Sequence, residues 1–281
     1  MTYIFVYGTL RKGERNDHFL RNATRVAEQS WTKGKLYDTG FGYPAVKPAK
    51  DSFVYGELYE VNDTELAAID RLEDYKEGGS DNLYDRVQQP IFTDTGEVNA
   101  LIYIAGNEAL LRDEIHSGDW KEYLVLNGQK NVLYFAYGSC MDNARFIEHG
   151  VDHYFQKFVG VAILPQYTLR FSIQSSLDRM GRADIVEEGG VVEGKLYDIP
   201  VAALKDYLYR REGVPFSYRP AFIRVQVKGK WVENVLTFVV AKKQDETAPP
   251  DHYSEEIIRG GTGFLSDGYI EKVKKHINKL R

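Results

Sequence analysis

One short pattern of residues occurs twice in this chain, 130 positions apart. Residues 3–10 (YIFVYGTL) and residues 133–140 (LYFAYGSC) are both apolar, aromatic runs that end in Tyr-Gly, a small hydroxyl residue and one further residue. A glycine at the end of a strand permits a tight turn whose backbone N–H groups can point towards a ligand. Because similar residues follow both copies, the pattern indicates a tandem duplication. We therefore expect two related domains, each with its own turn.

The composition excludes several classes of protein. A length of 281 residues with 43% hydrophobic side chains is sufficient for two packed domains. The net charge of −5, without a basic block, argues against a nucleic-acid partner. No apolar run approaches the ~18 residues of a membrane-spanning helix, and the N-terminus lacks the features of a secretory signal. Since Cys140 is the sole cysteine, an intramolecular disulfide is impossible and we expect a cytoplasmic protein.

The first half combines strands with short helices. Strand signals follow the first turn at residues 31–37, 54–59, 84–91 and 98–105. Between the second and third of these strands, Asn62 and Glu65 have the spacing of a capping box, which predicts a helix that ends near Glu73. Trp120 and Tyr123 are expected in a closing helix.

The second half repeats this order. Its strand signals include residues 159–164 and 168–171, and the segment 194–197 (GKLY) corresponds to 56–59 (GELY). A helix is expected to begin at Pro200, a favoured first-turn residue, and to end at Glu212. The distance from the glycine to the final glutamate is 17 positions in the first half and 18 in the second. We predict domains at 1–128 and 131–281 with a linker at 127–131, and an α+β fold with a curled sheet or barrel.

Each half thus has two elements that could perform chemistry. The turn offers N–H donors for a carboxylate or a developing oxyanion. The glutamate lies at the negative end of a helix, which raises its pKa and suits a general base. Most glutamates at helix ends are merely solvated. The occurrence of Glu73 and Glu212 at matching positions favours the catalytic interpretation.

Both halves resemble the gamma-glutamylcyclotransferase family. The first half is similar to its shorter branch of AIG2-like and gamma-glutamylamine cyclotransferase proteins through the segments Phe5–Leu10, Gly56–Tyr59, Ile69–Glu73 and Tyr84–Arg86, together with Gly13 and Asn16. The second half is similar to the longer branch through the segments Phe135–Ser139, Ala183–Ile185, Gly194–Tyr197, Arg211–Gly213 and Tyr218-Arg219. Together the two resemblances cover nearly the whole chain.

This resemblance implies two small mixed β-barrels with flanking short helices and a reaction without metal or cofactor. In that reaction, the α-amine of a γ-glutamyl compound attacks its own γ-carbonyl, which releases 5-oxoproline and an amine. By resemblance, Glu73 and Glu212 are the general acid/base residues. The substrate-binding residues implied are Tyr7, Gly8, Thr9, Leu10, Tyr137, Gly138, Ser139 and Cys140. The partner expected is a small γ-glutamyl molecule, and neither the leaving amine nor the oligomeric state follows from the sequence.

Departures from the family pattern suggest that the two sites differ. The longer branch usually has Asn where this chain has Cys140. Arg210 and Arg211 precede Glu212, and a guanidinium there would lower the glutamate pKa, whereas Asp74 and Glu77 would raise that of Glu73. We therefore expect the first half to hold the more active site.

Four other interpretations of the sequence are a ligand-binding module, a Cys–His nucleophile, a metal site and a phosphate-binding loop. A non-catalytic module that binds γ-glutamyl or amino-acid ligands would retain the same cavity. A Cys–His nucleophile would pair Cys140 with His149 or His153, although the first copy has Leu10 at this position. The six histidines show no metal-ligand spacing, and the glycines at 189–190 and 260–263 are expected in turns because they lack the pattern of a phosphate-binding loop.

Overall fold

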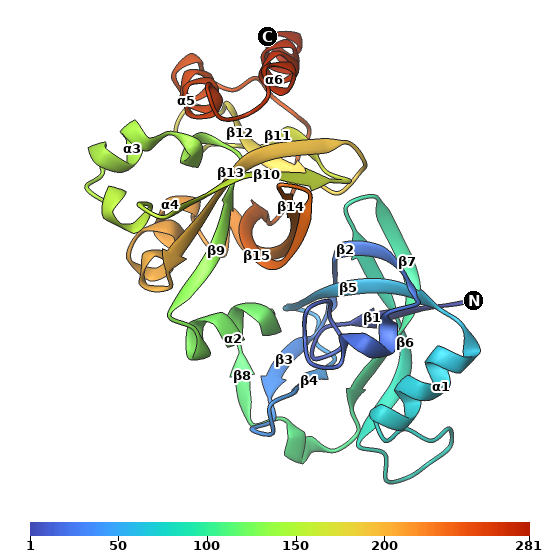
Figure 1. Ribbon diagram of the computed structural model, residues 1–281. Coiled ribbons are helices and arrows are strands. Elements are labelled where there is room, and N and C mark those ends of the chain that lie inside the picture. Colours follow the sequence, from blue (N-terminus) through green and yellow to red (C-terminus); the bar gives the residue numbers. More distant parts are fainter. The chain divides into compact units, whose positions relative to one another are not determined.

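The structure, a computed structural model, describes all 281 residues. The chain divides into two compact units, Met1–Leu124 and Val125–Arg281. Each unit contains a closed five-stranded barrel (Figure 1). The α+β fold with two β-barrels is therefore confirmed. None of the helices combines the length and the apolar character that crossing a membrane requires.

The first unit surrounds its barrel with one small sheet and short helices. The barrel order is β1 (Thr2–Val6), β5 (Phe53–Val61), β2 (Thr24–Lys33), β6 (Tyr84–Thr93) and β7 (Gly96–Ala105). The small sheet has the order β4 (Pro44–Lys47), β3 (Lys35–Asp38) and β8 (Asp113–Ile115). The helices are η1 (Asp17–Leu20), α1 (Asp63–Leu72), η2 (Glu108–Leu110) and α2 (Trp120–Gly128), the last of which crosses the division between the units.

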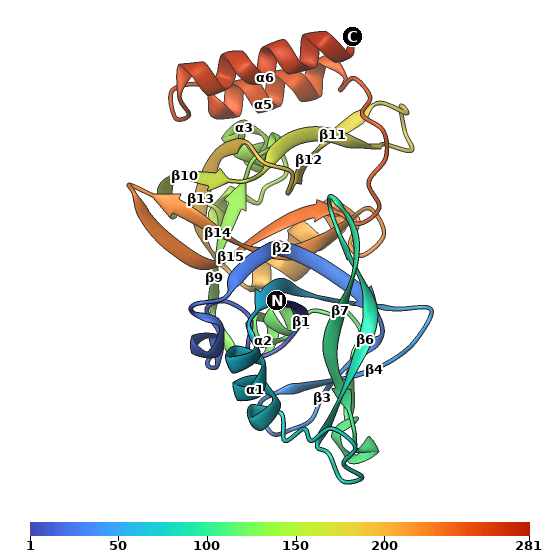
Figure 2. The same ribbon diagram turned by 90° about the vertical axis from the view of Figure 1, so that its right-hand side faces the viewer.

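The second unit has the same barrel with additional helices. Its barrel order is β10 (Phe158–Pro165), β13 (Val191–Pro200), β9 (Asn131–Ala136), β15 (Lys230–Val240) and β14 (Tyr218–Val227). The hairpin β11 (Thr168–Gln174) and β12 (Gly181–Val186) forms a separate sheet. The short helices are η3 (Ser139–Met141), α3 (Asn143–Glu148), η4 (Asp152–Tyr154), η5 (Leu204–Leu208) and α4 (Tyr209–Glu212). Two longer helices, α5 (Asp251–Gly261) and α6 (Asp267–Leu280), lie side by side next to β11 and β12 (Figure 2).

The two barrels pair their strands in the same register. Phe5 faces Leu58 in the first barrel, and Phe135 faces Leu196 in the second. The parallel contacts that close the barrels are equivalent as well, joining Ile4 to Leu101 and Tyr134 to Leu236. The duplication inferred from the turns therefore extends through the whole barrel.

One glycine in each barrel is required by the close approach of the first strand. A Cβ on Gly56 would lie 2.3 Å from the carbonyl oxygen of Val6, and a Cβ on Gly194 would lie 2.4 Å from that of Ala136. Both distances are far below van der Waals contact, so a side chain would push the strands apart. This explains the glycine that begins both 56–59 and 194–197.

Helix α1 agrees with its sequence signal. The Asn62 side chain accepts from the Glu65 N–H, and the Glu65 carboxylate accepts from the Asn62 N–H. The helix ends at Leu72, with Glu73 as its C-cap.

The predicted helix start at Pro200 is wrong. Pro200 is the last residue of β13 and pairs with Asn131, because a proline at a strand end carries the same local signal as one in a first helical turn. The helix that follows contains the π-helical turn Leu204–Leu208 before α4. A π-helical turn holds more residues than an α-helical turn. It therefore accommodates the extra residue between Pro200 and Glu212.

The predicted linker at 127–131 is too long. Helix α2 continues through Gly128, and the Gln129 N–H donates to the Val125 carbonyl (3.2 Å). Strand β9 begins at Asn131. Only Gln129 and Lys130 therefore lie between α2 and β9. The prediction placed the helix end too early because a helix can continue up to a glycine in its last turn.

Candidate functional site

The Tyr-Gly turns after β1 and β9 have the same backbone geometry. The Arg11 N–H donates to the Gly8 carbonyl (3.1 Å), and the Met141 N–H donates to the Gly138 carbonyl (3.0 Å). The residues inside these turns have N–H groups that donate to no protein acceptor, namely Thr9, Leu10, Ser139 and Cys140. Each turn therefore presents successive free donors, as the sequence predicted.

A buried ionic cluster holds the first turn. The Glu57 carboxylate accepts from the Lys12 N–H (2.9 Å), from Arg11 Nε (3.4 Å) and from Lys121 Nζ (3.3 Å). Asp119 completes the cluster by accepting from Arg11 Nη1 (2.8 Å). Burial would raise the pKa of Glu57, but Lys121 and Arg11 outweigh it and lower that pKa to about 2. The carboxylate is therefore charged and fixes the loop that follows the turn.

The second turn is held differently. Lys195 occupies the position of Glu57, and its Nζ donates to the Met141 carbonyl (2.9 Å). Helix α5 packs on the turn through Gly260, where a Cβ would lie 2.7 Å from the Asp142 nitrogen. The prediction of a turn at 260–263 is therefore partly wrong. The first two glycines of this segment are the last residues of α5, and Gly260 allows the close packing of that helix on the turn.

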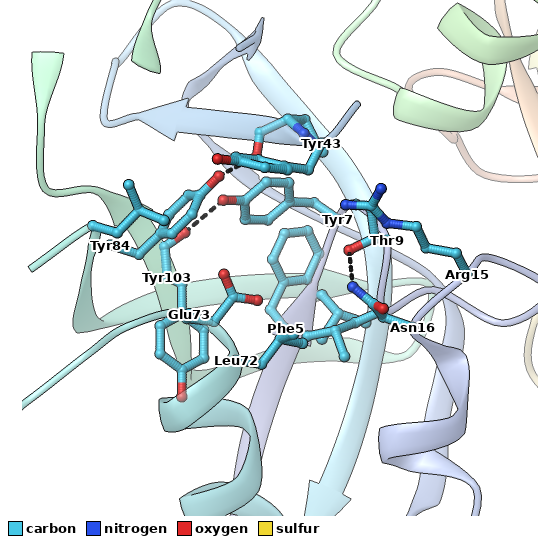
Figure 3. A pocket seen from close by; sticks show the side chains of 15 residues that line it. Phe5, Tyr7, Thr9, Arg15, Asn16, Tyr43, Leu72, Glu73, Tyr84 and Tyr103 are labelled. Carbon is cyan, nitrogen blue, oxygen red and sulfur yellow. Dashed lines mark hydrogen bonds between the residues drawn. The ribbon is translucent and has the colours of Figure 1, made fainter. Parts of the chain in front are cut away.

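Glu73 lies in a cavity of about 150 Å³ in the first unit. The predicted binding residues Tyr7, Gly8, Thr9 and Leu10 line the same cavity. Figure 3 shows the Glu73 carboxyl among the side chains of aromatic and apolar residues. It makes no hydrogen bond to the protein, and burial raises its pKa from 4.5 to about 7. The sequence predicted that repulsion from Asp74 and Glu77 raises the pKa of Glu73. These residues do not contribute, and the pKa is raised because burial removes water from the carboxylate.

The second unit places Glu212 in a larger cavity of about 510 Å³. Tyr137, Gly138, Ser139 and Cys140 line it as well. The Cys140 thiol donates to Glu212 Oε1 (3.5 Å). Burial raises the pKa of Glu212, while Arg211, Cys140 and Arg145 partly oppose the increase. Arg211 therefore acts as the sequence predicted, but burial prevails.

Different residues cover the turn glycine in the two cavities. In the first unit Pro44 lies over Gly8, so that a Cβ there would lie 2.6 Å from the proline ring. In the second unit the nearest atom to a Cβ on Gly138 is the smaller Ala183 side chain, at 3.3 Å. The loop after β11, including residues 174–177, lines the second cavity.

Corresponding tyrosines form the walls of both cavities. The hydroxyl of Tyr7 donates to the Tyr103 carbonyl (2.8 Å), as Tyr137 does to the Phe238 carbonyl (2.6 Å). A second pair, Tyr84 and Tyr218, donates to the carbonyls of Pro44 (2.8 Å) and Ala183 (2.7 Å) respectively. Burial raises the pKa of these tyrosines, which therefore remain neutral donors.

The environment of Cys140 does not support a thiolate nucleophile. Burial is the main cause that raises its pKa, and Glu212 raises it further. His149 and His153 are not among the residues that line the cavity, which has His252 instead. The thiol is therefore a neutral donor to the glutamate.

Sequence reasoning missed several residues of both cavities. The Asn16 side chain, quoted above only as part of the family pattern, donates to Thr9 Oγ1 (3.0 Å). Arg15 lies beside Thr9, on the side of the cavity away from Glu73 (Figure 3). The lining residues that were not singled out as part of a site include Tyr43, Tyr84, Tyr103, Arg15, Arg145, Arg182, Tyr218 and Tyr253. The spacing of 130 positions between the turns could have found Arg15 and Arg145, which both follow the glycine by seven residues.

Comparison with known proteins gives consistent results. The family described as "Gamma-glutamyl cyclotransferase, AIG2-like" matches residues 4–122, and the "AIG2-like family" matches residues 191–273. The chain is 44% identical to YkqA of Bacillus subtilis, provisionally named a gamma-glutamylcyclotransferase, over 99% of this chain and 98% of YkqA. The crystal structure of YkqA superposes with a TM-score of 0.89 at 43% identity, with the same coverage. The gamma-L-glutamyl-butirosin B gamma-glutamyl cyclotransferase of Niallia circulans is 37% identical over 124 residues, 44% of this chain and 78% of that enzyme.

Proposed function

Since this chain belongs to the gamma-glutamylcyclotransferase family, we propose that it converts a γ-glutamyl compound into 5-oxoproline and a free amine. One observation supports this proposal above all. In each unit, a glutamate of raised pKa lines the same cavity as a turn with free N–H donors. Such a cavity offers a base and an anion-binding site without any further group.

The proposed reaction begins with proton transfer. Ionised Glu73 or Glu212 accepts a proton from the α-ammonium group of the substrate, which frees the amine lone pair. The nitrogen attacks the γ-carbonyl carbon, a C–N bond forms, and negative charge develops on the carbonyl oxygen. Turn N–H groups stabilise that charge. The glutamic acid then donates its proton to the leaving nitrogen as the old C–N bond breaks and the carbonyl re-forms. The regenerated carboxylate accepts the second proton of the ring nitrogen, which gives the neutral lactam of 5-oxoproline, and this proton leaves with the departing amine as its ammonium form.

The physical demands on the protein are modest. The attacking amine and the carbonyl belong to one molecule, so holding the bent conformer supplies a large effective molarity. A glutamate with a pKa of about 7 can both accept and return a proton near neutral pH. The neutral tyrosine walls restrict the shape of the cavity.

The first pocket is the better candidate for the main site. The Glu73 carboxyl has no hydrogen-bond partner in the protein, whereas Glu212 accepts from Cys140 and lies beside the charged Arg211. Both neighbours favour the ionised form of Glu212 and weaken it as a base.

The test compares Glu73→Gln and Glu212→Gln by release of 5-oxoproline from a panel of γ-glutamyl amines, γ-glutamyl amino acids and glutathione. We expect Glu73→Gln to remove most turnover and the double variant to remove all of it. Glu77→Gln, which changes an exposed neighbour, is the control. Saturable binding heat without product from the unsubstituted chain would instead identify a binding module.

A further inference from the structure

The Arg211 guanidinium forms no salt bridge in the second pocket, although Glu212 lines the same cavity. Its Nη2 donates to Ser139 Oγ (2.9 Å), while its Nε is shielded from solvent and has no hydrogen-bond partner. A partly buried cation in this state lacks part of the stabilisation that water or an anion would provide. The guanidinium can therefore donate further hydrogen bonds to a ligand, and it lies beside the turn that carries free N–H groups.

The other arginines of the second pocket differ in this respect. Arg145 Nε also has no hydrogen-bond partner, but this guanidinium pairs with Glu256, and Arg182 pairs with Asp178 (2.8 Å). Arg210 is exposed on the helix surface. Arg211 is thus the one that contacts the turn directly without forming a salt bridge.

The first pocket obtains its guanidinium from another element. The position of Arg211 is taken there by Leu72, an apolar residue. Arg15 lines this pocket, lies beside Thr9 in Figure 3 and forms no salt bridge, although unlike Arg211 it is exposed to solvent. The residue equivalent to Arg15 by position is Arg145, which Glu256 neutralises in the second unit. Each pocket therefore has a guanidinium without a salt bridge beside its turn, partly buried in the second unit and exposed in the first, and a different segment contributes it in each unit.

A carboxylate is the ligand that matches this arrangement. A guanidinium binds a planar carboxylate through parallel N–H···O bonds, and backbone N–H groups are further donors to the same oxygens. Thr9 and Ser139, the residues beside the two guanidinium groups, also carry free N–H groups. In a γ-glutamyl substrate, the carboxylate that accompanies every leaving group is the α-carboxylate.

We propose that Arg211 in the second pocket and Arg15 in the first bind the α-carboxylate of the γ-glutamyl substrate. This proposal rests on the proposed function for the identity of the ligand. In this proposal an arginine binds the glutamyl end of the substrate in each unit, but the two arginines do not occupy equivalent positions in the two units. The guanidinium and the N–H of Thr9 or Ser139 together hold this carboxylate, which leaves the N–H of Leu10 or Cys140 for the oxyanion.

The test measures binding, so that it does not depend on turnover. The full chain carrying Glu73→Gln and Glu212→Gln is titrated calorimetrically with γ-glutamylalanine and with its analogue whose α-carboxylate is a carboxamide. We expect two sites that prefer the carboxylate by about ten- to a hundredfold, as for hydrogen bonds between charged groups. Arg211→Gln and Arg15→Gln should each leave one discriminating site, that is, one site that prefers the carboxylate over the carboxamide. The variant with both substitutions should have no such site.

The controls separate anchoring from folding. Lys205→Gln lies on the same helical segment as Arg211 and should retain both discriminating sites, as should Arg21→Gln for the first unit. Arg211→Lys should recover part of the preference because it restores the charge. Equal weakening of both ligands by Arg211→Gln would overturn the proposal, and so would a parent protein that does not distinguish carboxylate from carboxamide. Release of 5-oxoproline by the unsubstituted chain tests the proposed function independently.

Discussion

The thiol of Cys140 donates a hydrogen bond to Glu212, whereas Leu10 at the corresponding position offers nothing to Glu73. The two glutamates therefore have different protonation behaviour in otherwise equivalent barrels. One residue of the turn adjusts the pKa of the glutamate in the second unit, while the same turn has free backbone donors in both units.

Replacement of Cys140 should alter the pH dependence of the second pocket. The hydrogen bond from Cys140 lowers the pKa of Glu212, so Cys140→Ala should raise that pKa. In a Glu73→Gln background, the acidic limb of the rate of 5-oxoproline release should therefore move to higher pH. Cys140→Ser keeps a donor and should leave the limb near its original position. An equal shift in both variants would contradict a role for this hydrogen bond.

Glu73 should reduce the stability of the protein as the pH rises. Its pKa is raised from 4.5 to about 7, so the folded state retains a proton that the unfolded state loses between these values. The free energy of unfolding should fall across this window. A difference of about 2.5 units corresponds to at most ~3.4 kcal/mol, and partial solvent access reduces it to about 1–3 kcal/mol. Urea unfolding should show Glu73→Gln to be more stable by this amount at pH 8 and equal at pH 4. Glu77→Gln should show no such difference.

Loss of the Glu57 charge should destabilise the first turn. Glu57→Gln leaves Lys121 buried without its carboxylate partner, a change that typically costs about 3–5 kcal/mol. Denaturant unfolding should show this decrease at pH 7. Glu60→Gln, a neighbour on the same strand, is the control. If the loss were below about 1 kcal/mol, the cluster would not be what holds the turn.

Gly260→Ala should impair the second pocket selectively. The added methyl group would lie 2.7 Å from the Asp142 nitrogen and displace α5 from the turn that carries Ser139 and Cys140. Turnover by the second pocket, measured in a Glu73→Gln background, should fall at least tenfold. Gly268→Ala in α6 meets no atom within 4 Å and should have no such effect. Unchanged turnover in Gly260→Ala would show that the turn does not need this contact.

Local signals predicted much of the architecture. The duplicated run through Gly8 and Gly138 located both turns, and the capping box at Asn62 located α1 and hence Glu73. The prediction of a helix start at Pro200 was wrong because proline is accepted both at the end of a strand and in the first turn of a helix. The role of Glu73 and Glu212 stays a prediction, although their burial and raised pKa fit it.

Features that depend on distant segments could not be predicted in this way. The residues that cover the two turn glycines, Pro44 and Ala183, approach the turns only after folding. The neutralisation of Arg145 requires Glu256, 111 positions away in α5. Contacts between segments so far apart in the sequence produce no local or periodic pattern of residues. The differences between the two pockets therefore became visible only in the three-dimensional structure.

The π-helical turn at Leu204–Leu208 has an evolutionary consequence. A one-residue insertion into a regular α-helix would rotate every later side chain by about 100° about the axis and send Glu212 out of its cavity. A wide turn confines the insertion to a local bulge, and the end of the helix keeps its orientation. After duplication, the second copy could thus gain a residue while Glu212 kept its place in the wall of the cavity.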